Sequence, residues 1–449
     1  MTKRSALLSL CLAFFAVFAF GSTASARTIP GQYIVVLDDG ADAAAVAADH
    51  RRRAKADVLD TYSAALDGYA AKLSGAGLEA VRRDPRVASV VPDEEGSMTL
   101  GQMSPTGVRR IDTFADSAFT ATALATSGTG VTVNTDIAVY DTGVQTNHPE
   151  LNVAGGVNCL TTAVSSRSGN DGTIGDQYGH GTHVAGTIAA RDDSNGVVGV
   201  VPGARIWSVR VGDAAAIATT SGQLCGIDWV TANGPAKGIK VVNASTALLG
   251  QYDDGNCGYT AGDVLHQAIC RSRDAGILWV FAAGNGANDL HTIPGADYDE
   301  VLTVTASADA NGTPNVPTTK TFSCTPIGAK KPTAAETDDK YASFSKYAVR
   351  ASDQAHTVAA PGACIYSTYK GSSYGTANGT SMAAPHATGV AVTCIVQGQC
   401  TGTPAETITK LMADAEAYNR ANPGYGFTGD PLRPVTGRYY GFLLRAGLY

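Results

Sequence analysis

The sequence contains little charge, and no segment of it concentrates positive charge. Charged residues make up 16% of the 449 residues, and the formal net charge is -7. The short run Arg51-Arg52-Arg53 is typical of a solvent-exposed helix face, so we expect no nucleic acid partner. Hydrophobic residues nevertheless reach 44%. A chain with that much apolar material can bury a large core, which excludes an intrinsically disordered protein.

Long apolar runs are also scarce. The run at residues 7–20 is too short to span a bilayer comfortably. Lys3 and Arg4 precede it, and Ala24-Ser25-Ala26 follows it with the small residues that signal peptidase requires. A membrane anchor is the alternative interpretation. We expect instead a cleaved signal peptide over residues 1–26, and therefore a secreted, extracellular protein without membrane contact.

No pair of cysteines has the CxxC spacing of a zinc site. One of the 9 cysteines, Cys11, lies in the expected signal peptide. The others are even in number, which predicts disulfides in an exported chain. Their pairing stays open, and the sequence suggests only the close pairs Cys257/Cys270 and Cys394/Cys400.

Strand and helix patterns alternate through residues 27–98. Strands are predicted at residues 33–37, 69–73 and 87–91, and helices at residues 41–55 and 77–83. Such alternation over a short segment predicts a compact, ferredoxin-like α+β unit.

From about residue 100, short β-branched runs alternate with helical stretches. The expected strands lie at residues 136–140, 209–211, 239–242, 278–281 and 301–304. Buried apolar strands separated by helices predict a three-layer α/β fold, with a mostly parallel central sheet covered on both faces. Residues 310–340 are polar and predict a surface loop, and residues 439–444 predict a strand packed on the core.

Two motifs offer a carboxylate and an imidazole, two of the groups that acyl transfer needs. Asp141 ends the apolar run at residues 136–140, and His180 opens the small-residue run 179–187 (GHGTHVAGT). Asp-Thr-Gly alone also occurs in aspartic proteases, but these normally need two copies and the chain has one. A zinc site at His180 and His183 is excluded, because the spacing is not that of HExxH and the glutamate is missing.

Two further motifs offer a nucleophile and oxyanion donors. Ser381 lies at the start of a small-residue helix in the run 379–386 (GTSMAAPH). Its backbone N–H can point at an oxyanion, aided by the helix dipole. Asn285 follows an apolar strand in the run 282–286 (AAGNG). Asn-Gly is a common turn pair, but beside the other three motifs we expect Asn285 to donate its amide N–H to the oxyanion.

Together these motifs resemble the subtilisin family, which has its catalytic residues in the order Asp, His, Ser. The resemblance implies that Ser381 is the nucleophile, that His180 is the general base and that Asp141 orients His180. It also implies that His183 and His386 are structural. Residues 27–100 resemble the family's propeptide, a transient inhibitor of the enzyme's own active site. We therefore expect self-cleavage near Leu100-Gly101 and a peptidase domain over residues 101–449.

The same resemblance implies a substrate cleft and a calcium site. Ser245 keeps its place in a cleft strand, although Thr246 and Ala247 replace the family's Leu and Gly. Calcium ligands are implied at Gln102, Glu150 and Asp193, the last in a loop at residues 191–197. Carboxylate and carbonyl oxygens suit this ion. No cofactor is expected for catalysis.

These observations predict a monomeric endopeptidase that cleaves proteins or peptides through an acyl-enzyme intermediate. Two alternatives remain. One is a catalytically inactive binding relative. The other is a hydrolase of the same mechanism that acts on esters or on a single protein substrate.

Overall fold

A computed structural model describes residues 27–38, 40–63, 66–95, 102–112, 130–160, 173–314 and 319–449. The chain divides into two compact units, Met1–Leu100 and Gly101–Tyr449. The predicted signal peptide and the predicted cleavage point near residue 100 lie outside the described residues. Within the described ranges, no helix is both long enough and apolar enough to cross a membrane.

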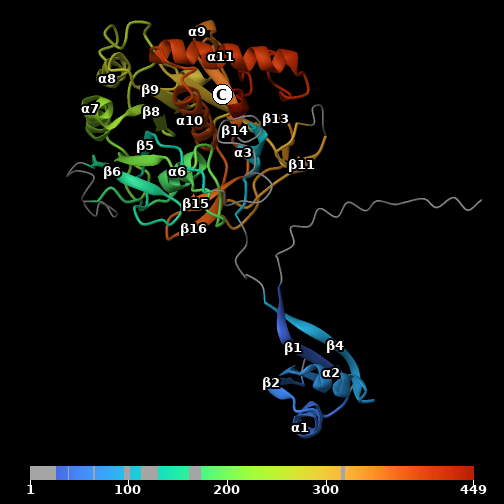
Figure 1. The fold of residues 1–449 in the computed structure, drawn as a ribbon. Coiled ribbons are helices and arrows are strands. Elements are labelled where there is room, and N and C mark those ends of the chain that lie inside the picture. Colours follow the sequence, from blue (N-terminus) through green and yellow to red (C-terminus); the bar gives the residue numbers. More distant parts are fainter. Residues whose placement is uncertain are drawn as a thin grey trace, which may run out of the picture. The chain divides into compact units, whose positions relative to one another are not determined.

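The first unit is a four-stranded antiparallel sheet with two helices (Figure 1). Its elements are β1 (Arg27–Leu37), α1 (Ala43–Arg53), β2 (Asp57–Tyr62), β3 (Gly68–Lys72), α2 (Gly75–Arg82) and β4 (Val87–Glu95). The strand order β2-β3-β1-β4 confirms the ferredoxin-like prediction. Sequence analysis missed β2, because the strand is mostly exposed and has no apolar alternation.

Local capping sets where the two helices of this unit begin. The side chain of Asp42 accepts a hydrogen bond from the backbone N–H of Ala45 at 3.0 Å. Ser74 does the same for Gly77 at 3.2 Å. Each cap satisfies a donor that has no partner within the helix, which stabilises that helix end by about 0.5–2 kcal/mol.

The second unit is built on an eight-stranded sheet with the order β13-β10-β9-β8-β5-β7-β6, and β14 pairs with β10. All neighbours are parallel except β13 and β10. The strands are β5 (Asp136–Asp141), β6 (Asn152–Asn158), β7 (Arg205–Arg210), β8 (Ile239–Ala244), β9 (Leu278–Ala282), β10 (Leu302–Ala308), β13 (Lys340–Tyr341) and β14 (Thr357–Pro361).

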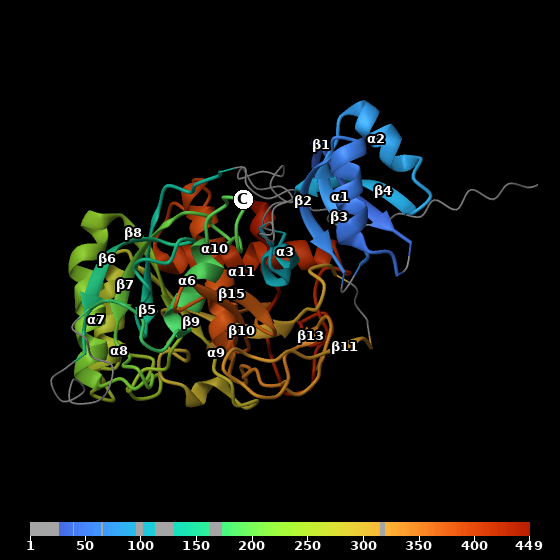
Figure 2. The same ribbon diagram turned by 90° about the horizontal axis from the view of Figure 1, so that it is seen from below.

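Helices cover both faces of this sheet, as Figures 1 and 2 show. One face packs against α6 (His180–Ala189) and α10 (Thr380–Val396), and the other against α7 (Thr220–Lys237) and α8 (Val264–Asp274). The remaining helices are α3 (Thr106–Arg110), α9 (Ala351–Gln354), α11 (Pro404–Ala421), η1 (Leu290–Thr292) and η2 (Ala446–Leu448). Two apolar cores, one on each face, confirm the three-layer prediction.

The strand order changes direction at β5. The chain places β7 on one side of β5 and then returns to place β8 on the other side. In open α/β sheets, ligands bind beyond the carboxyl ends of strands at such a point. Asp141 ends β5 and Ser245 directly follows β8, so the fold brings both residues to this edge.

Four disulfides join the eight cysteines of the second unit. They are Cys159–Cys225, Cys257–Cys270, Cys324–Cys364 and Cys394–Cys400. The two close pairs suggested by the sequence are confirmed. The other two close longer loops, of 66 and 40 residues, where cross-linking restricts the unfolded chain most.

Two predictions for the later part of the chain need revision. The polar segment at residues 310–340 contains a short antiparallel pair, β11 (Thr321–Phe322) and β12 (Glu336–Thr337). The strand predicted at residues 439–444 is wrong, because only isolated bridges at Tyr439 and Leu443 occur there. Leu443 is buried, as is Tyr440, so the apolar pattern reflects packing on the core rather than sheet pairing.

Candidate active site

Asp141 and His180 form a hydrogen-bonded pair at the carboxyl edge of the sheet. Asp141 is 3% exposed, and its Oδ1 and Oδ2 lie 2.8 and 3.0 Å from His180 Nδ1. A carboxylate can only accept hydrogen bonds, so Nδ1 carries the proton and Nε2 of a neutral ring has a free lone pair. The pair therefore presents a base toward solvent.

Small residues let helix α6 approach this edge closely. Gly179 has φ +110°, and a Cβ there would lie 2.3 Å from the ring of Tyr369. A Cβ on Gly181 would lie 2.1 Å from the carbonyl oxygen of Gly143. Only glycine fits at both positions, which explains why glycines flank His180.

Asp176 organises the start of α6, and sequence analysis missed it. Its Oδ1 accepts from Thr142 Oγ1, Tyr178 N and Gly179 N at 2.9, 3.0 and 2.7 Å. Its Oδ2 accepts from the backbone N and Oγ1 of Thr182 at 2.8 and 2.7 Å. An aspartate just before a helix is a capping signal, but the sequence alone does not reveal the link to Thr142.

Ser381 is held at the start of α10 by reciprocal hydrogen bonds with Ser245. Ser381 Oγ donates to the carbonyl oxygen of Ser245 at 3.2 Å, and Ser245 Oγ donates to that of Ser381 at 2.9 Å. Among the described residues, no hydrogen bond joins Ser381 Oγ to His180. Catalytic hydrogen bonds are often long or poorly aligned before substrate binds, so this geometry is compatible with a nucleophile–base pair.

Two donors converge beside Gly379. Asn285 Oδ1 accepts from Thr380 N at 2.8 Å, which turns its Nδ2 protons away from that contact. A Cβ built on Gly379 would lie 3.2 Å from Asn285 Nδ2 and 3.5 Å from Ser381 N. The two N–H groups therefore border one small space, as an oxyanion site requires.

The pKa of His180 is shifted in the opposite direction from the pKa values of His183 and His386. Burial opposes protonation of His180, but the charge and hydrogen bond of Asp141, helped by Asp176, raise its pKa above 6.5. Burial lowers the pKa of His183 to about 4 and that of His386 to about 4. The last two are neutral at physiological pH. Each binds backbone carbonyl oxygens.

Two cavities border His180. One, of about 180 Å³, is lined by residues of three strand ends, including Asp141, Gly212 and Ser245. The other, of about 370 Å³, is lined by Asn378 and Met382, among others. A larger cavity of about 980 Å³ lies elsewhere and contains none of the catalytic candidates.

The implied calcium ligands Gln102 and Glu150 each contribute a buried oxygen without a partner. Gln102 Nε2 donates to the carbonyl oxygens of Arg191 and Val197, while its Oε1 has no partner. Glu150 is 1% exposed, and its Oε2 also lacks a partner. Burial and the nearby charge of Asp193 raise the pKa of Glu150 to about 7, although a Tyr374 hydrogen bond lowers it. These oxygens fit a hard cation.

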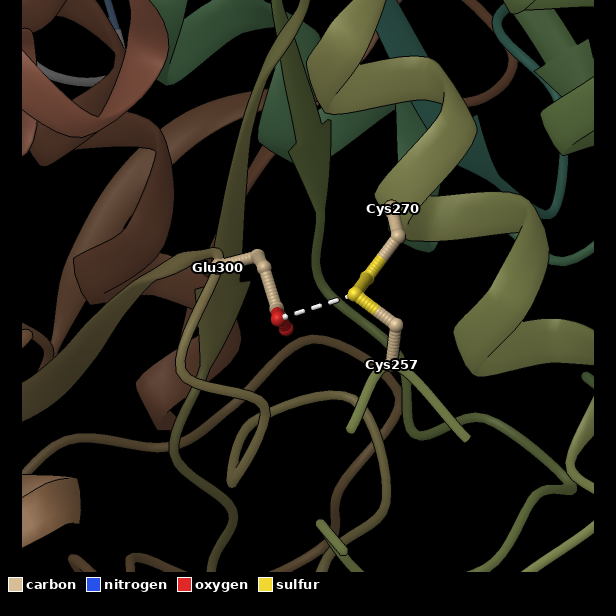
Figure 3. A group of neighbouring side chains, drawn as sticks. All are labelled: Cys257, Cys270 and Glu300. Carbon is tan, nitrogen blue, oxygen red and sulfur yellow. Dashed lines mark hydrogen bonds between the residues drawn. A yellow bond between two sulfur atoms is a disulfide. The ribbon is translucent and has the colours of Figure 1, made fainter. Parts of the chain in front are cut away.

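Two other groups of potential metal ligands in the described parts of the chain have partners that compete with a metal ion. Figure 3 shows Cys257 and Cys270 joined as a disulfide beside Glu300, so neither sulfur is a thiolate ligand. The carboxylates of Asp309 and Asp339 pair with buried Arg110 at 3.0 and 2.8 Å, which takes the place of a metal ion.

Family comparisons agree with this geometry. A model of the subtilase family matches residues 132–428, and a model of peptidase inhibitor I9 matches residues 32–98.

Curated relatives show the same similarity. M-protease of Shouchella clausii is 33% identical over 320 residues, which are 71% of this chain and 67% of the relative. The thermostable alkaline protease of Halalkalibacterium halodurans is 30% identical over 390 residues, 86% of this chain and 88% of the relative.

A solved structure of a cold-adapted subtilisin-like serine proteinase matches with a TM-score of 0.51 at 24% identity, covering 78% of this chain and 99% of that one. That likeness supports the fold. The assignment of the activity rests on the family match and on the curated relatives. The chain therefore belongs to the subtilase family and is a subtilisin-type serine endopeptidase preceded by an I9 inhibitor domain.

Proposed function

We propose that this chain is a secreted endopeptidase that uses Ser381, His180 and Asp141 to hydrolyse peptide bonds through an acyl-enzyme. The hydrogen bond from His180 Nδ1 to buried Asp141 carries the proposal, because it leaves Nε2 as an acceptor. The four disulfides support export to an oxidising compartment.

In the proposed reaction each of these groups has one role. His180 Nε2 takes the proton of Ser381 Oγ as Oγ attacks the scissile carbonyl carbon. The carbonyl oxygen becomes an oxyanion, which accepts from Asn285 Nδ2 and Ser381 N. His180 then gives its proton to the leaving nitrogen and the C–N bond breaks. Water then attacks the acyl-enzyme in the same way, His180 takes its proton, and the bond from the acyl carbon to Ser381 Oγ breaks. His180 relays one proton in each half of the reaction, from Ser381 to the leaving nitrogen and then from water back to Ser381, so the chemistry requires no catalytic cofactor.

Residues 27–100 act in this proposal as a transient inhibitor that the enzyme removes by cutting near Leu100-Gly101. The I9 match over residues 32–98 supports this role. The test is to express the chain, assay casein hydrolysis and read the N-terminus of the product by mass spectrometry. We expect activity to appear together with loss of residues up to about the cleavage point. An active full-length chain, or a processed chain without activity, would contradict the proposal.

The activity should depend on pH through His180. His180 must be neutral to accept a proton, and its pKa is raised above 6.5. We therefore expect kcat/KM to rise with pH, with a midpoint above 6.5, when measured between about pH 5 and 10. Asp141→Asn should lower this midpoint, because it removes the charge that favours the protonated ring. A midpoint clearly below 6 in the wild type would contradict the assignment of His180 as base.

We further propose that Gln102, Glu150 and Asp193 bind a structural calcium ion. Without calcium, the raised pKa of Glu150 means that stability is full below about pH 4.5 and falls as pH rises through about 7. At pH 8 we expect calcium-free Glu150→Gln to exceed wild type in unfolding free energy by up to about 3 kcal/mol, at about 1.4 kcal/mol per pKa unit.

With calcium bound, we expect the wild type to be more stable than Glu150→Gln, because the ion needs the charged carboxylate. Melting temperatures of enzyme blocked with a fluorophosphonate, measured in EDTA and in calcium, check both results. Glu416→Gln, which removes only a half-exposed ion pair with Arg420, is the control. Equal calcium responses in wild type and Glu150→Gln would refute this site.

A further inference from the structure

The polar segment at residues 319–340, here called the hairpin segment, is fastened to the strands that lead to Ser381. The disulfide Cys324–Cys364 ties it to the residue before β15 (Ile365–Tyr369). The backbone N–H of Ile327 donates to the carbonyl oxygen of Thr376 at 2.8 Å. Within the segment, Thr333 N donates to Cys324 O at 2.8 Å. The segment is therefore held by covalent, cross-strand and local bonds.

Ile327 packs directly on the strand that precedes the nucleophile. Gly375 lies in the middle of β16 (Ser373–Ala377), and a Cβ there would approach Ile327 Cδ1 to 2.5 Å. Glycine at position 375 thus leaves the space that the Ile327 side chain occupies. This close packing fixes one face of Ile327, while the residue remains partly exposed.

The hairpin segment and the active site share the cavity of about 370 Å³. Pro326, Ile327 and Thr333 form one wall. His180, Asn378 and Met382 line the same cavity, and the last two lie close to Ser381 in sequence. The smaller cavity, beside Ser245, also contains His180. His180 therefore lines both cavities.

We propose that the hairpin segment builds a binding pocket for an apolar substrate side chain on the leaving-group side of the scissile bond, with Ile327 as its specificity-determining residue. This inference rests on the proposed function. His180 must protonate the leaving nitrogen, so the chain beyond the scissile bond passes His180. If the cavity beside Ser245 binds the part of the substrate that becomes the acyl group, the cavity beside the hairpin segment binds the part that leaves with the amine. Its side chains from Pro326, Ile327 and Met382 favour an apolar occupant.

Capture of the acyl-enzyme by added amines tests the leaving-group side alone. A peptide methyl ester acylates Ser381, and an amino acid amide then attacks the ester carbon. The C–Oγ bond breaks, and the amine proton passes through His180 to Oγ. The measured quantity is the ratio of capture by leucinamide to capture by glycinamide. A pocket contributes about tenfold or more for added apolar groups, so we expect wild type to favour leucinamide by at least that factor.

Variants of Ile327 should change this ratio. Ile327→Ala is expected to lower the ratio several-fold, Ile327→Trp to abolish the preference by filling the pocket, and Ile327→Val to keep most of it. Lys330→Ala, an exposed change in the same segment, should match wild type. The ratio compares two amines that capture the same acyl-enzyme, so it does not depend on the rate of ester hydrolysis, and stoichiometric labelling with a fluorophosphonate shows that each variant is folded.

Two results would overturn the inference. Ester hydrolysis with the same ratio in wild type, Ile327→Ala and Ile327→Trp would refute the pocket and leave the proposed function intact. A wild type that hydrolyses no ester would refute the proposed function and the pocket together.

Discussion

Ser381→Ala is expected to reduce kcat for peptide hydrolysis about a million-fold, the loss known for the nucleophile of subtilisin's triad. The variant keeps the oxyanion donors and His180 but has no oxygen to form the acyl-enzyme. Because the proposed self-cleavage uses the same nucleophile, we also expect the variant to retain residues 27–100. Hydrolysis of a quenched peptide and the mass of the purified chain measure the two effects.

Ser352→Ala is a matched control for this change. Ser352 is an exposed serine in the short helix α9, and its hydroxyl donates only to the neighbouring Asp353. We expect wild-type processing and activity from this variant. Substantial hydrolysis by Ser381→Ala at the wild-type pH optimum would disprove the assignment of the nucleophile.

Asp141→Asn should reduce kcat about ten-thousand-fold, with the fold intact. The amide NH₂ would face His180 Nδ1, which must then accept, and the ring proton would move to Nε2. A protonated Nε2 is unable to take the proton of Ser381 Oγ. Steady-state kinetics and the circular dichroism spectrum of a trans-processed sample separate loss of chemistry from loss of structure.

Asp176→Asn is expected to affect stability more than catalysis, in contrast to Asp141→Asn. Its carboxylate accepts five hydrogen bonds around the start of α6, and an amide nitrogen would face donors. We expect a lower melting temperature and a much smaller loss of kcat than for Asp141→Asn. Equal kinetic losses in the two variants would show that Asp141 acts only through the position of His180.

His180 and Ser381 could be proposed as catalytic residues from sequence because each lies in a run whose small residues are dictated by local packing. Gly179 and Gly181 flank His180, since any Cβ there would collide with Tyr369 or Gly143. Gly379 leaves room between Asn285 and Ser381. Most of the parallel sheet was predictable too, because β5, β8 and β9 are buried apolar strands, whereas β6 is only partly buried and was missed.

Features that depend on distant contacts were not predictable. The Asp176 network joins the residue after β5, Thr142, to the start of α6, and no local sequence pattern predicts that contact. The pairing of Cys324 with Cys364 follows from how the hairpin segment lies on β16. For the same reason the sequence predicted only a surface loop for this segment. That Ile327 lines a cavity beside His180 is visible only in the structure.

Labelling with a serine-reactive fluorophosphonate, followed by peptide mapping, tests the central claim most directly. We predict one adduct per processed molecule, on the peptide that contains Ser381, with loss of activity in proportion to labelling. Asp141→Asn should label far more slowly, and Ser381→Ala should take up no label. A processed, active enzyme that carries the label on another serine, or none, would contradict the account.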